Sequence, residues 1–203
     1  MRNPIDRLFG RLPKPARVAH DWTLTIIGAV AIVLAIKAWV VNPYRIPSSS
    51  MEPTLLCARP APGCTARFSD RVLADRVIYH FRNPRRGEII VFKTPARARE
   101  VCEGSSGSSV FVKRLIGLPG ETISEKRGYV YINGKKLIEN YIQPARRDLR
   151  NYSAKRIPNG MYFFMGDNRA SSCDSRDWGP VPRANLIGKV FMTYWPPNRI
   201  SFH

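Results

Sequence analysis

The chain has 203 residues, enough for one globular domain of about 100–150 residues beside a membrane-length apolar segment. Lys and Arg outnumber Asp and Glu by 33 to 15, a formal net charge of +18 that is compatible with nucleic acid or anionic lipid. The basic residues are scattered, however, and no helix-turn-helix, zinc-finger spacing or RNA-binding aromatic motif accompanies them, so we expect no nucleic-acid partner.

Residues 22–41 are largely apolar, interrupted by two threonines and Lys37. Because about twenty residues at 1.5 Å rise cross a hydrocarbon core, the stretch predicts a transmembrane helix. Trp22 and Trp39 are expected to anchor it at the interfaces, and the Lys37 ammonium is expected to reach the headgroups. A cleavable signal peptide is the alternative. Its apolar core is usually about 7–15 residues long, and no clear small-x-small cleavage site follows here before Pro43.

The charges that flank this stretch predict its orientation. Five basic residues, Arg2, Arg7, Arg11, Lys14 and Arg17, precede it against two acidic ones. The flank 1–21 is therefore expected to stay cytoplasmic, and residues 42–203 to form an extracytoplasmic domain of a single-pass plasma-membrane protein. Residues 42–203 carry 27 Lys and Arg against 13 Asp and Glu. Long domains translocate largely regardless of charge, and such a basic domain is compatible with lying against membrane lipid.

Four cysteines, an even number, fit an oxidising compartment. The turn-rich loop 59–63 between Cys57 and Cys64 can bring their Cα atoms within the roughly 4.4–6.8 Å that a disulfide needs, so this is the first pair expected. Cys102 with Cys173 is then the remaining pair, although four cysteines allow three connectivities and free thiols stay an alternative. No Cys-x-x-Cys occurs and the three histidines are isolated, so a zinc site is disfavoured.

Beyond Asn42-Pro43, short apolar runs between Gly, Pro and Asn favour β structure. The candidate strands are Glu88–Lys93, Val110–Ile116, Tyr129–Ile132, Lys136–Glu139, Met161–Met165 and Lys189–Tyr194. Asn133-Gly134 predicts a type I′ hairpin, because both residues tolerate positive φ. The Gly/Ser-rich segment 100–109 predicts an exposed loop. Residues 122–159 predict a small β insertion.

Three motifs span most of the chain in a characteristic order. They are Pro47–Leu55 (PSSSMEPTL), Val112–Glu121 (VKRLIGLPGE) and Gly166–Gly179 (GDNRASSCDSRDWG). Together they resemble the type I signal peptidase family. The resemblance implies a mainly antiparallel β-sheet catalytic domain behind one N-terminal transmembrane helix. It also implies a membrane-anchored serine endopeptidase that removes signal peptides from exported preproteins, with no metal or cofactor.

The resemblance assigns roles to the first two motifs. Ser50 is the implied nucleophile and Lys113 the implied general base. The Ser48 hydroxyl and the Ser50 backbone N–H form the implied oxyanion hole. The alternative is a Ser-His-Asp triad, but His80 lies in no recognisable triad motif and His203 is the last residue.

In the third motif, Ser172 corresponds to the serine that orients the base, and Asp174 and Arg176 to a supporting pair. The chain departs from the commoner family pattern at residues 170–171, where Ala-Ser replaces Asp-Asn, and it places a cysteine inside the motif. Asp167-Asn168 is expected to form a turn and not to act in catalysis.

A lysine can act as a base only when it is neutral. At a pKa near 10.4 about one lysine in 2,500 is neutral at pH 7, whereas at a pKa near 8 about a tenth is neutral. Burial lowers a lysine pKa, and apolar residues surround Lys113 in sequence. Strand alternation predicts that Lys113 shares a face with Phe111 and Leu115, and that Arg114 points to the opposite face.

The resemblance implies substrates with small residues at the first and third positions before the cleaved bond. A maturation peptidase specialised for one pilin or conjugation substrate would share every motif, and an inactive binding or scaffold protein could keep the fold. The SOS-repressor autoproteases also use a Ser-Lys dyad, but they couple it to a soluble DNA-binding domain.

Overall fold

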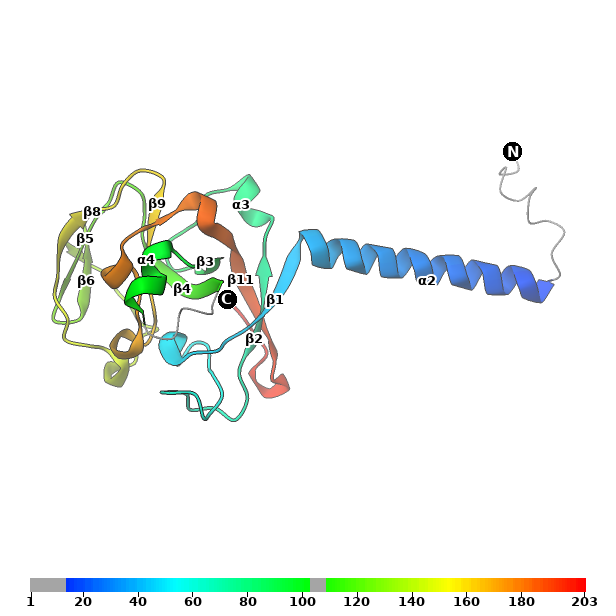
Figure 1. Ribbon diagram of the computed structural model, residues 1–203, viewed down its shortest axis with the longest axis horizontal. Coiled ribbons are helices and arrows are strands. Elements are labelled where there is room, and N and C mark those ends of the chain that lie inside the picture. The colour runs from blue at the N-terminus through cyan, green and yellow to red at the C-terminus, as the bar shows by residue number, and fades with distance from the viewer. Residues whose placement is uncertain (1–13, 103–108) are drawn as a thin grey trace. The chain divides into compact units, whose positions relative to one another are not determined.

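The computed structural model describes residues 14–102 and 109–203, without the side chains of residues 14, 16, 17 and 36–39. The chain forms two compact units, Met1–Val41 and Asn42–His203. The described part of the first unit is a helix and the second unit is mainly β (Figure 1). The predicted fold class, antiparallel β with one apolar N-terminal helix, is confirmed.

Helix α2 runs from Lys14 to Trp39. The window Val18–Ala35 has a mean hydropathy of 1.8, and none of it is buried within the protein. Both threonine hydroxyls of the stretch donate to carbonyls one turn earlier, so neither is left without a partner. The helix is thus long and apolar enough to cross a membrane. It begins before the expected span 22–41 and ends short of Val41, and the Lys37 and Trp39 side chains lie outside the described residues.

The larger sheet has eight strands in the order β1-β2-β11-β3-β4-β9-β10, with β12 also paired to β11. Neighbouring strands from β2 to β10 are antiparallel. The strands are β1 Val41–Arg45, β2 Arg71–Asp75, β3 Ile89–Lys93, β4 Val110–Gly117, β9 Met161–Met165, β10 Val181–Pro182, β11 Leu186–Trp195 and β12 Ser201–Phe202. The short helices are α3 Ile78–Phe81, α4 Ala96–Val101 and α5 Ser175–Trp178, with 3-10 turns η1 Ser49–Met51, η2 Pro144–Arg146, η3 Arg169–Ser171, η4 Arg183–Asn185 and η5 Pro197–Arg199.

Strand β4 lies inside the larger sheet, between β3 and β9. Its neighbours are almost wholly apolar, as expected of strands covered on both faces. In the register with β3, Lys113 is opposite Ile90, which is fully buried. The candidate base therefore sits on a central strand that is fixed from both sides.

The smaller sheet has the order β7-β6-β5-β8. Its strands are β5 Thr122–Lys126, β6 Tyr129–Ile132, β7 Lys135–Lys136 and β8 Tyr152–Arg156, all within residues 122–159. An apolar cluster joins this sheet to the larger one. Gly117 lies at the junction, where a Cβ would approach Ile157 Cδ1 to 2.3 Å. The predicted hairpin is confirmed, since Asn133 and Gly134 link β6 to β7 with φ values of 50° and 79°.

Two local predictions are wrong. The strand expected over Lys136–Glu139 ends at Lys136, because the Glu139 carboxylate turns inward and pairs with the buried guanidinium of Arg169. The loop expected over 100–109 begins later, because residues 100 and 101 complete α4. Residues 103–108 of that loop lie outside the described residues.

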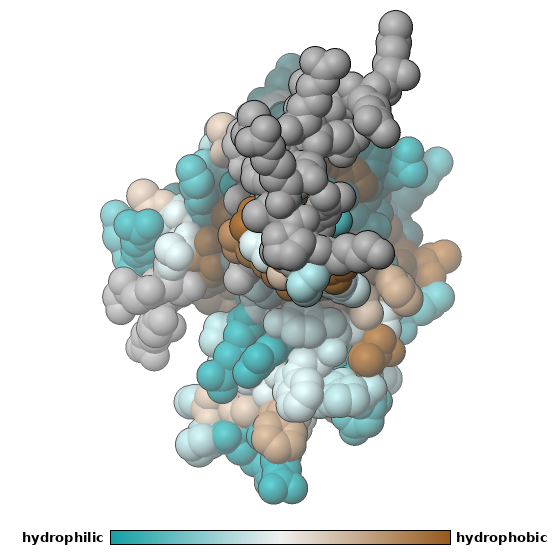
Figure 2. Space-filling view, turned by 90° about the vertical axis from the view of Figure 1, so that its right-hand side faces the viewer, coloured by the Kyte–Doolittle hydropathy of each residue, from teal (hydrophilic) through white to brown (hydrophobic). Residues whose placement is uncertain are grey.

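The excess of basic residues is only partly a property of the surface. On the face shown in Figure 2, hydrophilic residues predominate and hydrophobic ones are scattered among them. The side chains of Arg114, Arg169 and Arg176, however, are only 11%, 0% and 3% exposed, and each forms an ion pair with a buried carboxylate. Part of the positive charge is therefore located inside the second unit, where it neutralises buried carboxylates.

Candidate active site

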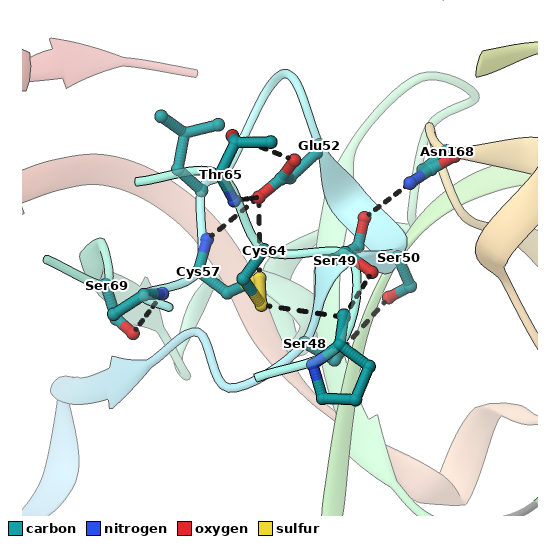
Figure 3. Close-up of a disulfide and its surroundings, with 12 residues drawn as sticks. Ser48, Ser49, Ser50, Glu52, Cys57, Cys64, Thr65, Ser69 and Asn168 are labelled. Carbon is teal, nitrogen blue, oxygen red and sulfur yellow. Dashed lines mark hydrogen bonds between the residues drawn. A yellow bond between two sulfur atoms is a disulfide. The ribbon is translucent and has the colours of Figure 1, made fainter. Parts of the chain in front are cut away.

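Ser50 lies in the 3-10 turn η1, where it is 8% exposed. The Ser48 and Ser50 hydroxyl oxygens are 3.4 Å apart. Asn168 of the third motif holds this turn from one side, because its backbone N–H donates to the Ser50 carbonyl at 3.0 Å and its side-chain amide donates to the Ser49 carbonyl at 3.1 Å. Figure 3 shows Asn168 approaching the serine turn. The first and third motifs are thus joined at the candidate nucleophile.

A disulfide between Cys57 and Cys64 lies beside the serine turn, with a Cα separation of 5.1 Å (Figure 3). The fully buried Glu52 carboxylate accepts hydrogen bonds from the Thr65 N–H and hydroxyl, both at 3.2 Å, and pairs with Arg146 at 2.8 Å. Ligand atoms of Glu52, Cys57 and Cys64 lie within 4.8 Å of one another, the one such group of candidate metal ligands among the described residues. Both sulfurs are bonded to each other, so this group offers a metal only a single carboxylate.

Lys113 of β4 is 3% exposed, and its Nζ donates a hydrogen bond to Ser172 Oγ at 3.0 Å. Nζ also lies 5.9 Å from the centre of the Phe111 ring, so the two side chains share a strand face as expected. Lys113, Ser50 and Ser48 line one cavity of about 440 Å³. In the described part of the chain no hydrogen bond joins Nζ to Ser50 Oγ. Such catalytic contacts commonly tighten only when substrate binds.

The environment of Lys113 favours its neutral form. Burial lowers the pKa of Lys113 to about 8, and the nearby Arg176 guanidinium acts in the same direction, whereas the Asp174 carboxylate opposes both. At that pKa about a tenth of the amines are neutral at pH 7. A neutral amine keeps a lone pair for a serine proton while its N–H groups donate to Ser172.

Asp174 and Arg176 form the supporting pair that the third motif implies. Arg176 Nε and one terminal nitrogen donate to the two Asp174 oxygens at 2.8 and 2.9 Å, and the Gly166 N–H donates to Asp174 at 3.1 Å. Burial alone would raise the pKa of Asp174, but the Arg176 guanidinium lowers it below its usual value. Asp174 also caps α5 through a capping box with Asp177. The segment that carries Ser172 is thereby fixed.

A second ion pair, between Arg114 and Asp167, lies near the site, and the sequence analysis did not predict it. Arg114 donates to both carboxylate oxygens of Asp167 at 2.8 and 2.6 Å, and the Thr54 hydroxyl donates to the same carboxylate at 2.5 Å. Asp167 is fully buried, so its role exceeds the turn predicted for it. The signal in the sequence was Arg114 itself, which alternation places on the strand face opposite Lys113.

Gly166 is a further residue that the sequence did not single out. A Cβ at this position would lie 2.3 Å from Ser172 Oγ and 2.4 Å from the Ser50 carbonyl oxygen. Only glycine therefore lets Ser172, which accepts the hydrogen bond from Lys113, and the backbone of Ser50 approach so closely.

Cys102 and Cys173 form the second disulfide, with Cα atoms 5.9 Å apart. Both cysteines line the cavity that contains Ser50 and Lys113. The histidines of the alternative triad lie elsewhere in the described structure. His80 is exposed on helix α3, His203 hydrogen-bonds to Thr193, and neither lines the cavity.

Comparison with known proteins assigns the chain to a family. The family model described as "Signal peptidase, peptidase S26" matches residues 19–195. A probable signal peptidase I-2 from Synechocystis sp. is 38% identical over 87% of this chain and 73% of that protein. A signal peptidase I from Leptolyngbya laminosa is 40% identical over 93% of this chain and 86% of that protein. A crystal structure of a signal peptidase I from Enterococcus faecalis, 35% identical, covers 54% of this chain and 97% of that chain with a TM-score of 0.42. The chain is therefore a serine peptidase that belongs to the signal peptidase family, peptidase S26.

Proposed function

We propose that the protein is a membrane-anchored endopeptidase that cleaves signal peptides from exported preproteins with a Ser50–Lys113 dyad. The observation that carries this proposal is the buried Lys113 amine, which lines one cavity with Ser50 and Ser48 and has a pKa of about 8. The relatives named as signal peptidases support the choice of substrate.

In the proposed mechanism, neutral Lys113 takes the proton of Ser50 as Oγ attacks the carbonyl carbon of the scissile bond. The Ser48 hydroxyl, 3.4 Å from Ser50 Oγ, and the Ser50 N–H donate to the oxyanion that develops. The Lys113 ammonium then protonates the departing amine of the mature protein, which leaves the signal peptide as an ester on Ser50. Water attacks this ester after losing a proton to Lys113, and that proton returns to Ser50 Oγ as the ester breaks.

The cavity suits an extended peptide. Residues 44–48 and residues 110–113 of β4 both line it. Side chains of an extended peptide alternate in direction, so the first and third residues before the bond would enter the same wall. The resemblance to the signal peptidase family supports small residues at these two positions, the pattern of secretory cleavage sites.

The proposal includes the topology expected from the sequence. Helix α2 would span the plasma membrane with its N-terminus in the cytoplasm, and the second unit would lie outside, its basic surface compatible with anionic lipid. Protease added to right-side-out vesicles should digest the second unit, and a peptide epitope tag placed at the N-terminus should remain intact. If the second unit is digested only after the vesicles are opened, the orientation is the opposite of the one proposed.

The activity test uses the full-length protein in detergent with a preprotein that carries an Ala-x-Ala site. Ser50→Ala and Lys113→Ala should each reduce cleavage to background, and Ser48→Ala should lower kcat by about 100- to 1,000-fold. Ser49→Ala and Lys93→Ala are matched controls, because neither residue lines the cavity, and both should stay active. Wild-type cleavage by Lys113→Ala would show that the base is assigned wrongly.

A further inference from the structure

The walls of the cavity belong to two separate apolar clusters. Val110 and Val112 of β4 pack against one cluster with Ile46 and Met51. Phe111, between them on the strand, packs against the other cluster. Alternation along β4 therefore divides the cavity into a first wall, formed by Ile46, Met51, Val110 and Val112, and a second wall on the side of Phe111.

The disulfide Cys102–Cys173 belongs to the second wall. Both cysteines line the cavity and pack in the same cluster as Phe111. Cys102 is 7% exposed at the end of α4, and the Phe111 ring stacks on Trp178 with 5.1 Å between centres. This wall thus consists of an aromatic face and two sulfur atoms held in place by the disulfide, a surface suited to apolar side chains.

The segment that carries Ser172 has anchors besides the disulfide. Ser172 precedes Cys173, but its segment is already fixed by the ion pair of Asp174 with Arg176 and by the hydrogen bond that the Phe164 N–H donates to Ser175 Oγ at 3.0 Å. The position of the disulfide at the cavity therefore calls for another explanation.

We infer that the Cys102–Cys173 disulfide and Phe111 form the binding surface for the middle residue of the Ala-x-Ala site, and that they select a bulky apolar side chain there. This inference rests on the proposed function. The residue directly before the cleaved bond has to lie at Ser50, and Met51, which follows Ser50, belongs to the first wall. Lys113 shares a strand face with Phe111 and so approaches Ser50 from the side of the second wall. With the first and third residues before the bond against the first wall, the middle residue points to the second.

The test compares peptides with Leu, Phe or Gly at the middle position, using full-length wild type and the double variant Cys102→Ala/Cys173→Ala. Wild type should cleave the Leu and Phe peptides with a kcat/KM on the order of tenfold above that of the Gly peptide. In the double variant this ratio should fall to about threefold or less, with the requirement for Ala at the first position and the pH profile both unchanged. An equal loss for all peptides together with a shifted pH profile would mean that the disulfide positions the base, which would overturn the inference.

A second measurement does not depend on the folding of the double variant. A peptide with a photoreactive diazirine side chain at the middle position is bound to the Ser50→Ala protein and irradiated, and the adducts are mapped by mass spectrometry. Adducts on Phe111 or on the two disulfide-linked peptides support the inference, and adducts on Ile46 or Met51 overturn it. Failure of wild type to cleave any of the peptides would reject the proposed function itself, whereas cleavage without a middle-position preference would reject only this inference.

Discussion

Replacing Lys113 by Met should abolish cleavage and yet stabilise the protein at neutral pH. Burial lowers the pKa of Lys113 from 10.5 to about 8, and each tenfold change in proton affinity corresponds to about 1.4 kcal/mol. Below pH 8 the amine is protonated in the folded and the unfolded chain, so folding buries a charge at a cost of about 3 kcal/mol. Met is uncharged and similar in length, but it loses the hydrogen bond to Ser172, worth about 1 kcal/mol. The expected gain in the free energy of unfolding at pH 7 is therefore about 2 kcal/mol.

The pH dependence of this gain identifies its cause. Between about pH 8 and pH 10.5 the amine is neutral in the folded chain and still protonated in the unfolded chain, so wild type gains stability relative to the variant as pH rises. Urea unfolding of the full-length proteins in detergent, followed by near-ultraviolet circular dichroism at pH 7 and pH 10, measures both values. Lys93→Met is the control, because Lys93 is exposed at the end of β3, and it should change stability by less than about 0.5 kcal/mol. A Lys113→Met variant that is less stable than wild type at pH 7, or a gain that does not change with pH, would refute the reasoning.

Two further predictions concern the residues that support the proposed dyad. Gly166→Ala should lower kcat/KM by about 100-fold, because the new Cβ would lie within 2.4 Å of both Ser172 Oγ and the Ser50 carbonyl oxygen. A peptide cleavage assay measures the loss, and a fully active variant would contradict the prediction. Asp174→Ala should lower the free energy of unfolding by about 3 kcal/mol, because the buried Arg176 side chain loses two hydrogen bonds to this carboxylate while Asp148 and Glu125 remain as its partners. Chemical denaturation measures the loss, and a change below about 1 kcal/mol would show that the pair contributes little.

Local sequence patterns were sufficient for the elements whose signal is local. The apolar runs of β3 and β9 and the Asn133-Gly134 turn carry their own periodicity or turn chemistry, and the structure has them close to the predicted bounds. The stretch that forms α2 is recognisable from composition alone.

Elements defined by distant partners could not be predicted in this way. Strand β8 is mostly exposed and polar, and it exists because β5 pairs with it. Glu139 leaves its expected strand because the Arg169 guanidinium, thirty residues further along the chain, needs a buried partner. Asp167 looked like a turn residue because nothing near it in sequence reveals the ion pair with Arg114.

In the candidate site, too, some features have a local sequence signal and others depend on residues far away in the chain. The motifs singled out Ser48, Ser50 and Lys113, and the structure brings all three to one cavity. The sequence also suggested that Lys113 is surrounded by apolar residues, but the depth of its burial depends on packing across the sheet. The value of its pKa, about 8, therefore follows only from the folded structure.

The central claim is that a neutral Lys113 amine activates Ser50, and the pH dependence of kcat/KM for peptide cleavage tests it most directly. Because only the neutral amine accepts the proton and its pKa is about 8, kcat/KM should rise tenfold per pH unit below pH 7.5 and level off above about pH 8.5. A profile that is flat between pH 6 and pH 9, or that levels off below pH 7 as expected for a histidine base, would contradict the account.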